Sequence, residues 1–189
     1  MSISTPDTIR AFTLVELLVA VVLGGLVLTG VLTTNVQLMK SGLRVTQYAE
    51  MSSQTRRAIE QIESDLKSAS GITWNTSSDI TLTIPTSAGG TRQVTYAWTS
   101  ATQAFFMVPG TSSAVTAGRV YLASGIPTRP DGSAGVLFAR YDLAGVAATT
   151  DLATKRIQVS LNLVRTRTTA AKSTDTTVSA SFILRNKPT

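Results

Sequence analysis

Glu16 is the residue whose position most suggests chemistry, because it is the one ionisable side chain in a long apolar stretch. From Phe12 to Leu32, the 21 residues include only Thr13, Glu16 and Thr29 as polar ones. A carboxylate at the centre of a membrane helix costs roughly 2.5–3.5 kcal/mol, so an acid in such a segment marks a functional site by default. Position alone leaves two interpretations open. The acid either pairs with another group inside the membrane, or it lies at the interface and reaches the lipid headgroups.

The sequence lacks two residue types that many catalytic and metal sites use. The chain contains no Cys and no His, which excludes thiolate nucleophiles, imidazole bases and the usual zinc ligand sets. Its 11 acidic residues form no catalytic motif. We therefore expect no catalytic residue, no metal site and no cofactor, and a protein that is not an enzyme. The net charge of +6 comes from scattered residues, which does not favour a dedicated polybasic arm.

The stretch around Glu16 has the length of a membrane span. As a helix, residues 12–32 would extend about 31 Å, close to the ~30 Å hydrocarbon core of a bilayer. A secretory signal peptide does not fit, because the apolar run is too long, no small-x-small cleavage site ends it, and the helical pattern continues beyond it. The sequence predicts a transmembrane helix at residues 12–33.

A more specific signal surrounds the same residue. The string RAFTLVELLVA at residues 10–20 resembles the prepilin cleavage and methylation motif of type IV pilins and type II secretion pseudopilins. The resemblance implies a leader peptide at residues 1–11, cleavage between Ala11 and Phe12 by prepilin peptidase, and N-methylation of Phe12. Ala11 stands where the family usually has Gly, a departure that bears on the efficiency of processing rather than on its occurrence.

The resemblance also implies a role for Glu16, the fifth residue of the mature chain. In a filament of this family, the acid neutralises the new N-terminal amine of a neighbouring subunit. Opposite charges in a low-dielectric helix bundle attract strongly, and each offsets the desolvation of the other. Glu16 and Phe12 are therefore the expected assembly charge pair, which acts on registry and not on catalysis.

The helical period continues through residues 34–70, where the helix is predicted to become amphipathic. Two ion pairs with i,i+4 spacing, Arg56–Glu60 and Glu63–Lys67, lie largely off the apolar stripe. We expect the stripe to be core. It comprises Tyr48, Met51, Thr55, Ala58, Ile59, Ile62, Leu66 and Ala69.

One helix can include both stretches, because no Pro occurs between Phe12 and Ile84. We predict a continuous helix from Phe12 to about Ser68, with Gly71 as its stop signal.

The remainder, residues 71–189, shows the period of two that is typical of strands. The alternation predicts seven strands at residues 80–84, 94–98, 104–108, 119–122, 136–141, 157–163 and 178–184. The first three are expected to form a meander and the last two a hairpin. The predicted fold is α+β and pilin-like, with the long N-terminal helix covering one face of an antiparallel β-sheet.

The order of elements and the closing sequence SASFILRN at residues 179–186 resemble the W-type minor pilins and the J-type pseudopilins. The resemblance implies a structural subunit of the bacterial inner membrane, single-pass, with its C-terminal domain in the periplasm or outside the cell. The subunit would assemble into, or prime, a type IV pilus or a type II secretion pseudopilus. The partners implied are prepilin peptidase, other pilin or pseudopilin subunits, the inner-membrane assembly platform and membrane lipid.

Two alternatives stay open at this point. The same scaffold could carry a tip binding module, an adhesin or a DNA receptor. DNA is the less favoured partner, because the sequence shows no cluster of basic and aromatic residues. The second alternative is a plain single-span membrane protein that forms no filament.

Overall fold

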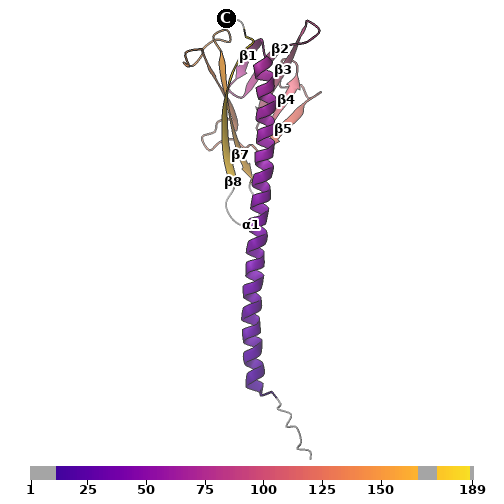
Figure 1. Ribbon diagram of the computed structural model, residues 1–189, viewed down its shortest axis with the longest axis vertical. Helices are drawn as coiled ribbons and strands as arrows, with labels where there is room; N and C mark the ends of the chain where they lie inside the picture. The colour runs from indigo at the N-terminus through magenta and orange to yellow at the C-terminus, as the bar shows by residue number, and fades with distance from the viewer. Residues whose placement is uncertain (1–11, 166–173, 188–189) are drawn as a thin grey trace, which may run out of the picture. The chain divides into compact units, whose positions relative to one another are not determined.

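The α+β class predicted from the sequence is confirmed (Figure 1). The computed structural model describes residues 12–165 and 174–187. Its elements are α1 (Leu14–Ser68), β1 (Gly71–Thr76), β2 (Asp79–Pro85), β3 (Thr91–Thr99), β4 (Ala104–Pro109), β5 (Val120–Ser124), β6 (Val136–Tyr141), β7 (Arg156–Arg165) and β8 (Thr174–Ile183). The chain divides into two compact units, Met1–Thr46 and Gln47–Thr189.

The predicted long helix is confirmed, since α1 runs from Leu14 to Ser68. The boundary expected between residues 33 and 34 lies inside it. The prediction of Gly71 as its stop is wrong, because Gly71 is already the first residue of β1. The helix ends where the backbone N–H of Ser70 donates to the carbonyl of Thr83, at 2.8 Å. Pairing with β2, rather than a glycine cap, therefore ends α1.

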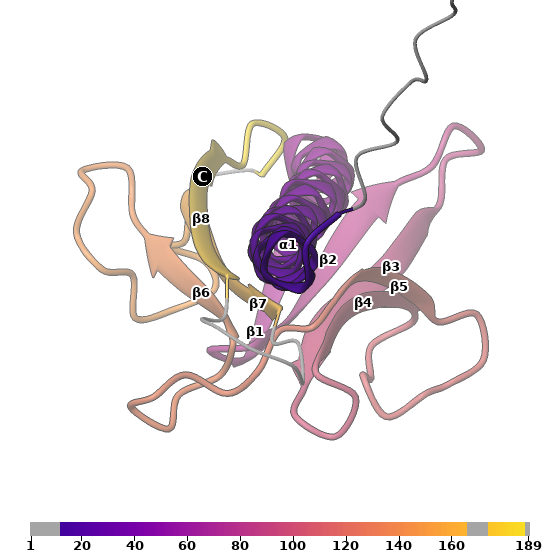
Figure 2. The same cartoon turned by 90° about the horizontal axis from the view of Figure 1, so that it is seen from below.

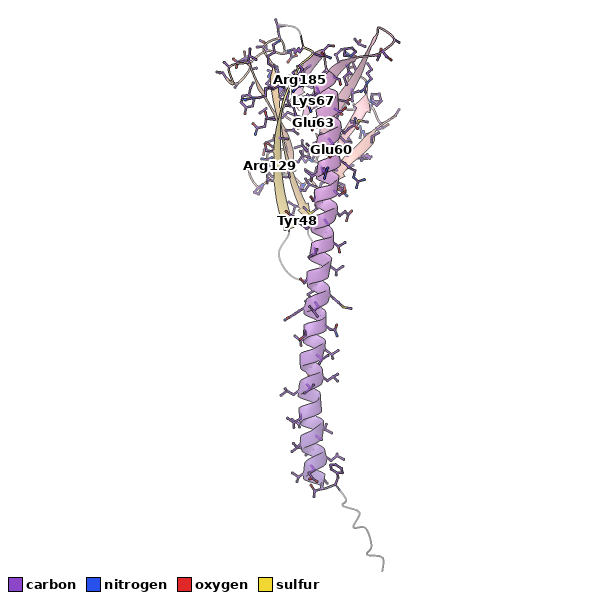
Figure 3. The ribbon with its side chains drawn as sticks, in the orientation of Figure 1. Tyr48, Glu60, Glu63, Lys67, Arg129 and Arg185 are labelled. Carbon is purple, nitrogen blue, oxygen red and sulfur yellow. The ribbon has the colours of Figure 1, made fainter. Side chains whose placement is uncertain are left out.

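Both ion pairs expected on the helix surface are present. Arg56 Nε lies 2.7 Å from Glu60 Oε1, and Lys67 Nζ lies 2.5 Å from Glu63 Oε1. Figure 3 labels Glu60, Glu63 and Lys67 along the same stretch of α1. Exposed pairs of this spacing stabilise a helix by a few tenths of a kcal/mol. They support the helix and do not hold the fold.

The strands form two sheets, so the expectation of a single seven-stranded sheet is wrong. One sheet has the order β1-β2-β3-β4-β5, and the other has the order β6-β7-β8. The predicted meander and the predicted β7–β8 hairpin are confirmed, and every pair is antiparallel. The sheets separate at residues 125–135, which form no strand of their own, although the carbonyls of Gly125 and Gly135 accept from N–H groups of β7. A Cβ added at Gly135 would lie 2.4 Å from the Pro127 carbonyl oxygen.

Strand β1 was not expected, because its sequence, GITWNT, has little alternation of polar and apolar residues. It forms by pairing with β2, in a register that places Gly71 opposite Thr83 and Trp74 opposite Ile80. The strand depends on its neighbour rather than on its own pattern, which is common for segments whose side chains are only partly buried.

The C-terminal part of α1 packs between the two sheets (Figure 2). The predicted stripe is buried except for Ile59, which is partly buried, and Tyr48, which is 54% exposed. A single apolar cluster joins all three layers. It comprises Met51, Ala58, Ile62, Leu66, Ala69, Ile72, Ile80, Leu82, Ile84, Val94, Tyr96, Phe105, Ala123, Ile126, Val136, Phe138, Ile157, Val159, Leu161, Leu163 and Leu184. Burial of each large side chain of this kind stabilises the fold by about 1.5–3 kcal/mol.

A buried carboxylate connects the helix to the five-stranded sheet. Asp65 is 4% exposed, and both of its oxygens are paired with side chains of β3. The guanidinium of Arg92 donates to Oδ1 and the hydroxyl of Tyr96 donates to Oδ2, each at 2.7 Å. The periodicity of apolar residues did not predict this contact, because Asp65 is a polar residue beside the apolar stripe. It fixes the helix against β3 in a way that apolar packing alone cannot.

A second polar cluster joins the two sheets at their contact. Arg140 of β6 donates to Asp151 Oδ1 at 2.7 Å, and its guanidinium lies 4.8 Å from the ring centroid of Trp74 in β1. The N–H of Phe138 in turn donates to the Ser77 carbonyl at 2.7 Å. Hydrogen bonds and a cation–π contact therefore connect β6 to the β1–β2 hairpin.

The first prediction concerns where the folded unit begins. A truncated protein that starts at Gln47 should fold, because all the buried helix residues lie after that point. One that starts at Ile62 should not, because it lacks the buried Met51 and Ala58, and the loss of a buried Met side chain alone costs about 2–5 kcal/mol. Far-ultraviolet circular dichroism with cooperative urea unfolding measures both. An unfolded Gln47 protein, or a folded Ile62 protein, would contradict the helix-between-sheets core.

The second prediction concerns alkaline pH. Burial, and then the hydrogen bond to Asp65, raise the pKa of Tyr96 above its ordinary value of 10.0. Below pH 10 the phenol is protonated whether the chain is folded or not. Above it, the unfolded chain ionises more readily, so the contribution of Tyr96 to stability is lost as the pH rises.

At pH 8, Tyr96→Phe should therefore lower the free energy of unfolding by about 1–3 kcal/mol, because one oxygen of Asp65 loses its partner. The variant should unfold at a lower urea concentration than wild type. Between pH 9 and pH 11 the same variant should lose less stability than wild type. Tyr121→Phe is the matched control, since Tyr121 is 56% exposed. Equal pH dependence of wild type and Tyr96→Phe would rule out a shifted phenol at this position.

Candidate functional site

The first turn of α1 contains the polar residues that the sequence singled out. Thr13 precedes the helix, which begins at Leu14, and Glu16 is its third residue. The N–H of Thr13 donates to Glu16 Oε2 at 3.0 Å, and the N–H of Glu16 donates to Thr13 Oγ1 at 3.2 Å. The Thr13 hydroxyl also donates to Glu16 Oε2, at 3.0 Å. These reciprocal bonds are a capping box, which pairs backbone N–H groups that a helix start leaves free.

The capping box gives Glu16 an intrachain role that sequence reasoning missed. The spacing that could have predicted it, Thr-x-x-Glu ahead of an apolar run, is present in the sequence. A carboxylate in the first turn is further favoured by the partial positive charge of the helix N-terminus. Glu16 thus has polar partners within its own chain before any neighbour arrives.

The side chains around this polar turn are apolar and uncovered. Phe12 is 83% exposed, Leu14 is 80% exposed, and the other large apolar residues through Leu32 are also exposed. Within the described residues, α1 is the one helix that is long and apolar enough to cross a membrane. A surface of this extent needs an apolar environment, which lipid or neighbouring helices can supply.

The remaining polar groups of the apolar stretch bond to their own helix. The hydroxyl of Thr29 donates to the carbonyl of Gly25 at 2.8 Å, and the hydroxyl of Thr34 donates to that of Gly30 at 2.9 Å. Thr33 makes the same contact with the carbonyl of Thr29. A hydroxyl bonded to the preceding turn is satisfied without water. These threonines are therefore compatible with a lipid-exposed helix.

Some of the site residues that the sequence predicts lie at this end of α1. Phe12 and Glu16 are described, whereas Ala11 and the leader at residues 1–11 lie outside the described residues. The amine that Glu16 is expected to neutralise exists only after cleavage, so the Glu16–Phe12 pair stays a prediction. No group of three or more acidic side chains gathers within residues 12–165 and 174–187.

A comparison with known families identifies this end of the chain. Residues 8–32 match the prokaryotic N-terminal methylation motif. The chain carries a type IV prepilin-like signal. The matched residues include Thr13 and Glu16 of the capping box and most of the exposed apolar surface. A search of curated proteins finds no match to the chain. The strands, which begin at Gly71, lie beyond the matched segment.

The prepilin-like signal and the apolar helix together support anchoring in a membrane by the N-terminal segment. The signal supports a type IV pilin-like or pseudopilin-like precursor. Among the described residues, this site provides a capped helix start and an exposed apolar surface.

Proposed function

We propose that this protein is a structural minor pilin or pseudopilin subunit. It inserts in the bacterial inner membrane through α1, with the β-rich unit in the periplasm or outside the cell. Prepilin peptidase removes residues 1–11 and methylates the amine of Phe12. The mature subunit then joins other pilin or pseudopilin subunits at the inner-membrane assembly platform. There it assembles into, or primes, a type IV pilus or a type II secretion pseudopilus.

The observation that carries this proposal is the coincidence of the methylation motif with an exposed apolar helix. The motif match spans residues 8–32, and the large apolar side chains from Phe12 to Leu32 are uncovered within the chain. A plain membrane anchor would explain the helix, but it would need no methylation signal at its start. A filament subunit needs both, because its helix leaves lipid to pack against other helices.

The capping box suggests how Glu16 serves both stages. Before assembly its carboxylate accepts hydrogen bonds from Thr13, which lowers the cost of placing an acid near the membrane. After cleavage, the amine of Phe12 on a neighbouring subunit offers a charged partner, and a carboxylate can accept more than the bonds that Thr13 makes. Glu16 then holds two subunits in register.

The minor-subunit assignment rests on the size of the β-rich unit. The described residues form eight strands in two sheets, with long connections at residues 110–119 and 142–155, and make a bulkier unit than a single small sheet. A subunit with such a large β-rich unit fits more readily at the tip of a filament, or at its initiation, than among the tightly packed subunits along its length. The resemblance to W-type and J-type subunits points the same way.

The third prediction tests processing. Ala11→Leu should leave an uncleaved precursor in the membrane, because a bulky side chain would occupy the position where the peptidase family accepts a small residue. Ala11→Gly is the matched control and should be cleaved at least as well as wild type. Mass spectrometry of the mature N-terminus measures the outcome. N-methyl-Phe12 in wild type would also exclude a plain single-span protein, and its absence would refute the proposed function.

The fourth prediction separates the capping role of Glu16 from the charge-pair role. Glu16→Gln keeps a side chain that can close a capping box but removes the charge, whereas Glu16→Ala removes both. If Glu16 pairs with the Phe12 amine, both variants should be cleaved normally and then fail to enter filaments. Removing one partner of a buried ion pair costs ~3–5 kcal/mol, or about a hundredfold or more in an assembly constant.

Thr13→Val is the control for capping, because it removes the hydroxyl and leaves the carboxylate. It should cost about 1 kcal/mol of helix stability and still co-fractionate with sheared filaments. If Glu16→Gln reached normal levels in the filament fraction while Thr13→Val was absent from it, the role of Glu16 would be helix capping and not charge pairing.

A further inference from the structure

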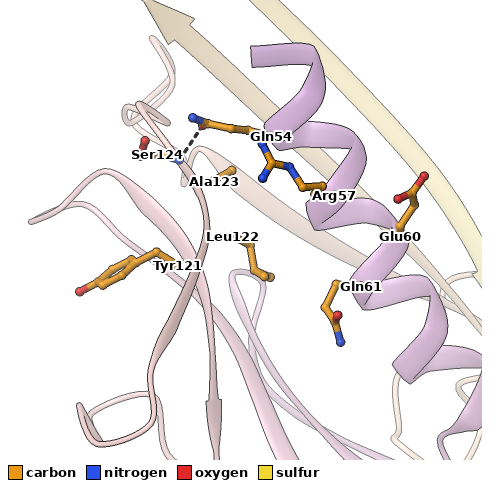
Figure 4. A pocket seen from close by; sticks show the side chains of 8 residues that line it. All are labelled: Gln54, Arg57, Glu60, Gln61, Tyr121, Leu122, Ala123 and Ser124. Carbon is orange, nitrogen blue, oxygen red and sulfur yellow. Dashed lines mark hydrogen bonds between the residues drawn. The ribbon is translucent and has the colours of Figure 1, made fainter. Parts of the chain in front are cut away.

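A groove lies between α1 and the edge strand β5 in the β-rich unit (Figure 4). Its volume is about 600 Å³, which is in the range of protein sites that enclose a ligand. We call it the α1–β5 groove. The helix contributes four polar side chains and the strand contributes the other wall. The groove is lined by Gln54, Arg57, Glu60, Gln61, Tyr121, Leu122, Ala123 and Ser124.

Strand β5 is the last strand of its sheet and pairs with β4 alone among the described residues. Natural edge strands are usually protected by charged residues, Pro or a covering segment. The sequence of β5, Val-Tyr-Leu-Ala-Ser, contains no charged residue and no Pro. The register of the β4–β5 pair shifts between Phe105 and Phe106. Such an irregularity is one of the devices that protect edges, but it places no charge on the edge of β5.

The open edge of β5 already binds a group from across the groove. The backbone N–H of Ser124 donates to the side-chain carbonyl oxygen of Gln54, at 3.4 Å (Figure 4). This distance is longer than the 2.7–3.2 Å of a strong N–H···O bond. The amide of Gln54 therefore occupies, weakly, a position that the carbonyl of an added strand would occupy at a shorter distance.

The opposite edge of the same sheet makes contacts of the same kind. In β1, the N–H of Trp74 donates to the carboxylate of Asp151 at 3.3 Å. Next to it, the Ser77 carbonyl accepts from Phe138 of the other sheet. At the end of β5, the Gly125 carbonyl likewise accepts from the N–H of Val164 in β7, at 3.0 Å. Both edges thus receive contacts from the rest of the chain, and β5 differs in that it borders the α1–β5 groove.

The charges of the groove indicate what kind of strand fits it. Glu60 is paired with Arg56, at 2.7 Å. Among the described residues, the guanidinium of Arg57 donates to Ser53, with its Nε 3.4 Å from the carbonyl oxygen and its Nη2 3.2 Å from Oγ. No carboxylate of the described residues forms a salt bridge with Arg57. The groove therefore holds, beside the edge of β5, a guanidinium that forms no salt bridge among the described residues, while the carboxylate of Glu60 on the same wall is bound by Arg56.

We infer that the α1–β5 groove binds an extended polypeptide strand of a partner protein, which pairs with β5 and directs a carboxylate toward Arg57. Main-chain hydrogen bonds to an exposed edge supply affinity in this mode of recognition, and the flanking side chains supply specificity. Five residues of β5 span about 17 Å, so a strand of about six residues covers the edge. The inference concerns the β-rich unit and does not rest on N-terminal processing or on filament assembly.

The fifth prediction uses the full chain in detergent micelles and a defined peptide probe. The probe is a mixture of acetylated, amidated hexapeptides with Asp at the third position and Val, Ile, Thr or Ser at the others. One control mixture has Asn in place of Asp, and a second has alternate backbone nitrogens methylated. Hydrogen–deuterium exchange followed by mass spectrometry reports on residues 120–124.

The Asp mixture should slow exchange in β5, and the N-methylated mixture should not, because it cannot form the ladder of hydrogen bonds. Arg57→Gln should weaken binding roughly threefold to tenfold, as expected for a partly exposed charged hydrogen bond, and should bring it to the level of the Asn mixture. Lys67→Gln is the matched control, since it removes one positive charge from α1 outside the groove, and it should bind like wild type. Gln54→Ala frees the Ser124 N–H and should bind more tightly.

Three results would overturn the inference. The first is unchanged exchange in β5 at millimolar concentrations of both the Asp and the Asn mixtures. The second is equal binding of the N-methylated mixture, which would show that the backbone of the peptide is not recognised. The third is an equal effect of Arg57→Gln and Lys67→Gln, which would remove the assigned carboxylate partner. Circular dichroism of each variant verifies that the fold is retained.

Discussion

The β-rich unit depends on the burial of one face of α1 between two sheets that otherwise share few contacts. Ile62 and Leu66 are fully buried in the cluster that includes residues from both sheets. Asp65, on the same turns, adds a constraint of a different kind. Apolar side chains tolerate small shifts along a helix, whereas a carboxylate with two partners at 2.7 Å does not. A buried acid without these partners would cost several kcal/mol, so Arg92 and Tyr96 select one register of the helix against β3.

The same helix meets a second constraint at its N-terminal end, where no described residue covers its apolar side chains. Polar groups there are satisfied within the helix itself, by the Thr13–Glu16 capping box and by threonine hydroxyls bonded to preceding carbonyls. This local satisfaction is what lipid requires, because lipid offers no hydrogen bonds. It also leaves the surface uniform, so that contact with neighbouring helices can replace contact with lipid without the exposure of an unpaired backbone group.

The two edge strands of the five-stranded sheet show how tertiary contacts give similar elements different surroundings. Both β1 and β5 are edge strands by topology. At β1 the contacts come from Asp151 and, at Ser77, from the neighbouring sheet, while at β5 they come from Gln54 and, at Gly125, from β7. The groove beside β5 follows from the path of residues 125–135, which carries the chain away from β5 and starts the second sheet elsewhere. A chain that paired β6 with β5 would have had no such edge.

The sequence by itself determined the elements whose signals are local. An apolar run without Pro specified α1 to within two residues of its start, and alternation specified seven of the eight strands, because burial of one face imposes a period that is visible in the chain. The prepilin-like signal was equally local, since its residues are consecutive, and its Thr-x-x-Glu spacing was present but not interpreted as a cap.

Only the tertiary structure decided the features that depend on partners distant in sequence. These are the strand β1, which needs β2, the division into two sheets, the exposure of Tyr48, and the pairing of Asp65 with residues 27 and 31 positions away. A polar residue beside an apolar stripe looks solvated until its partners are known, because the same carboxylate is costly alone and stabilising when both of its oxygens are bound.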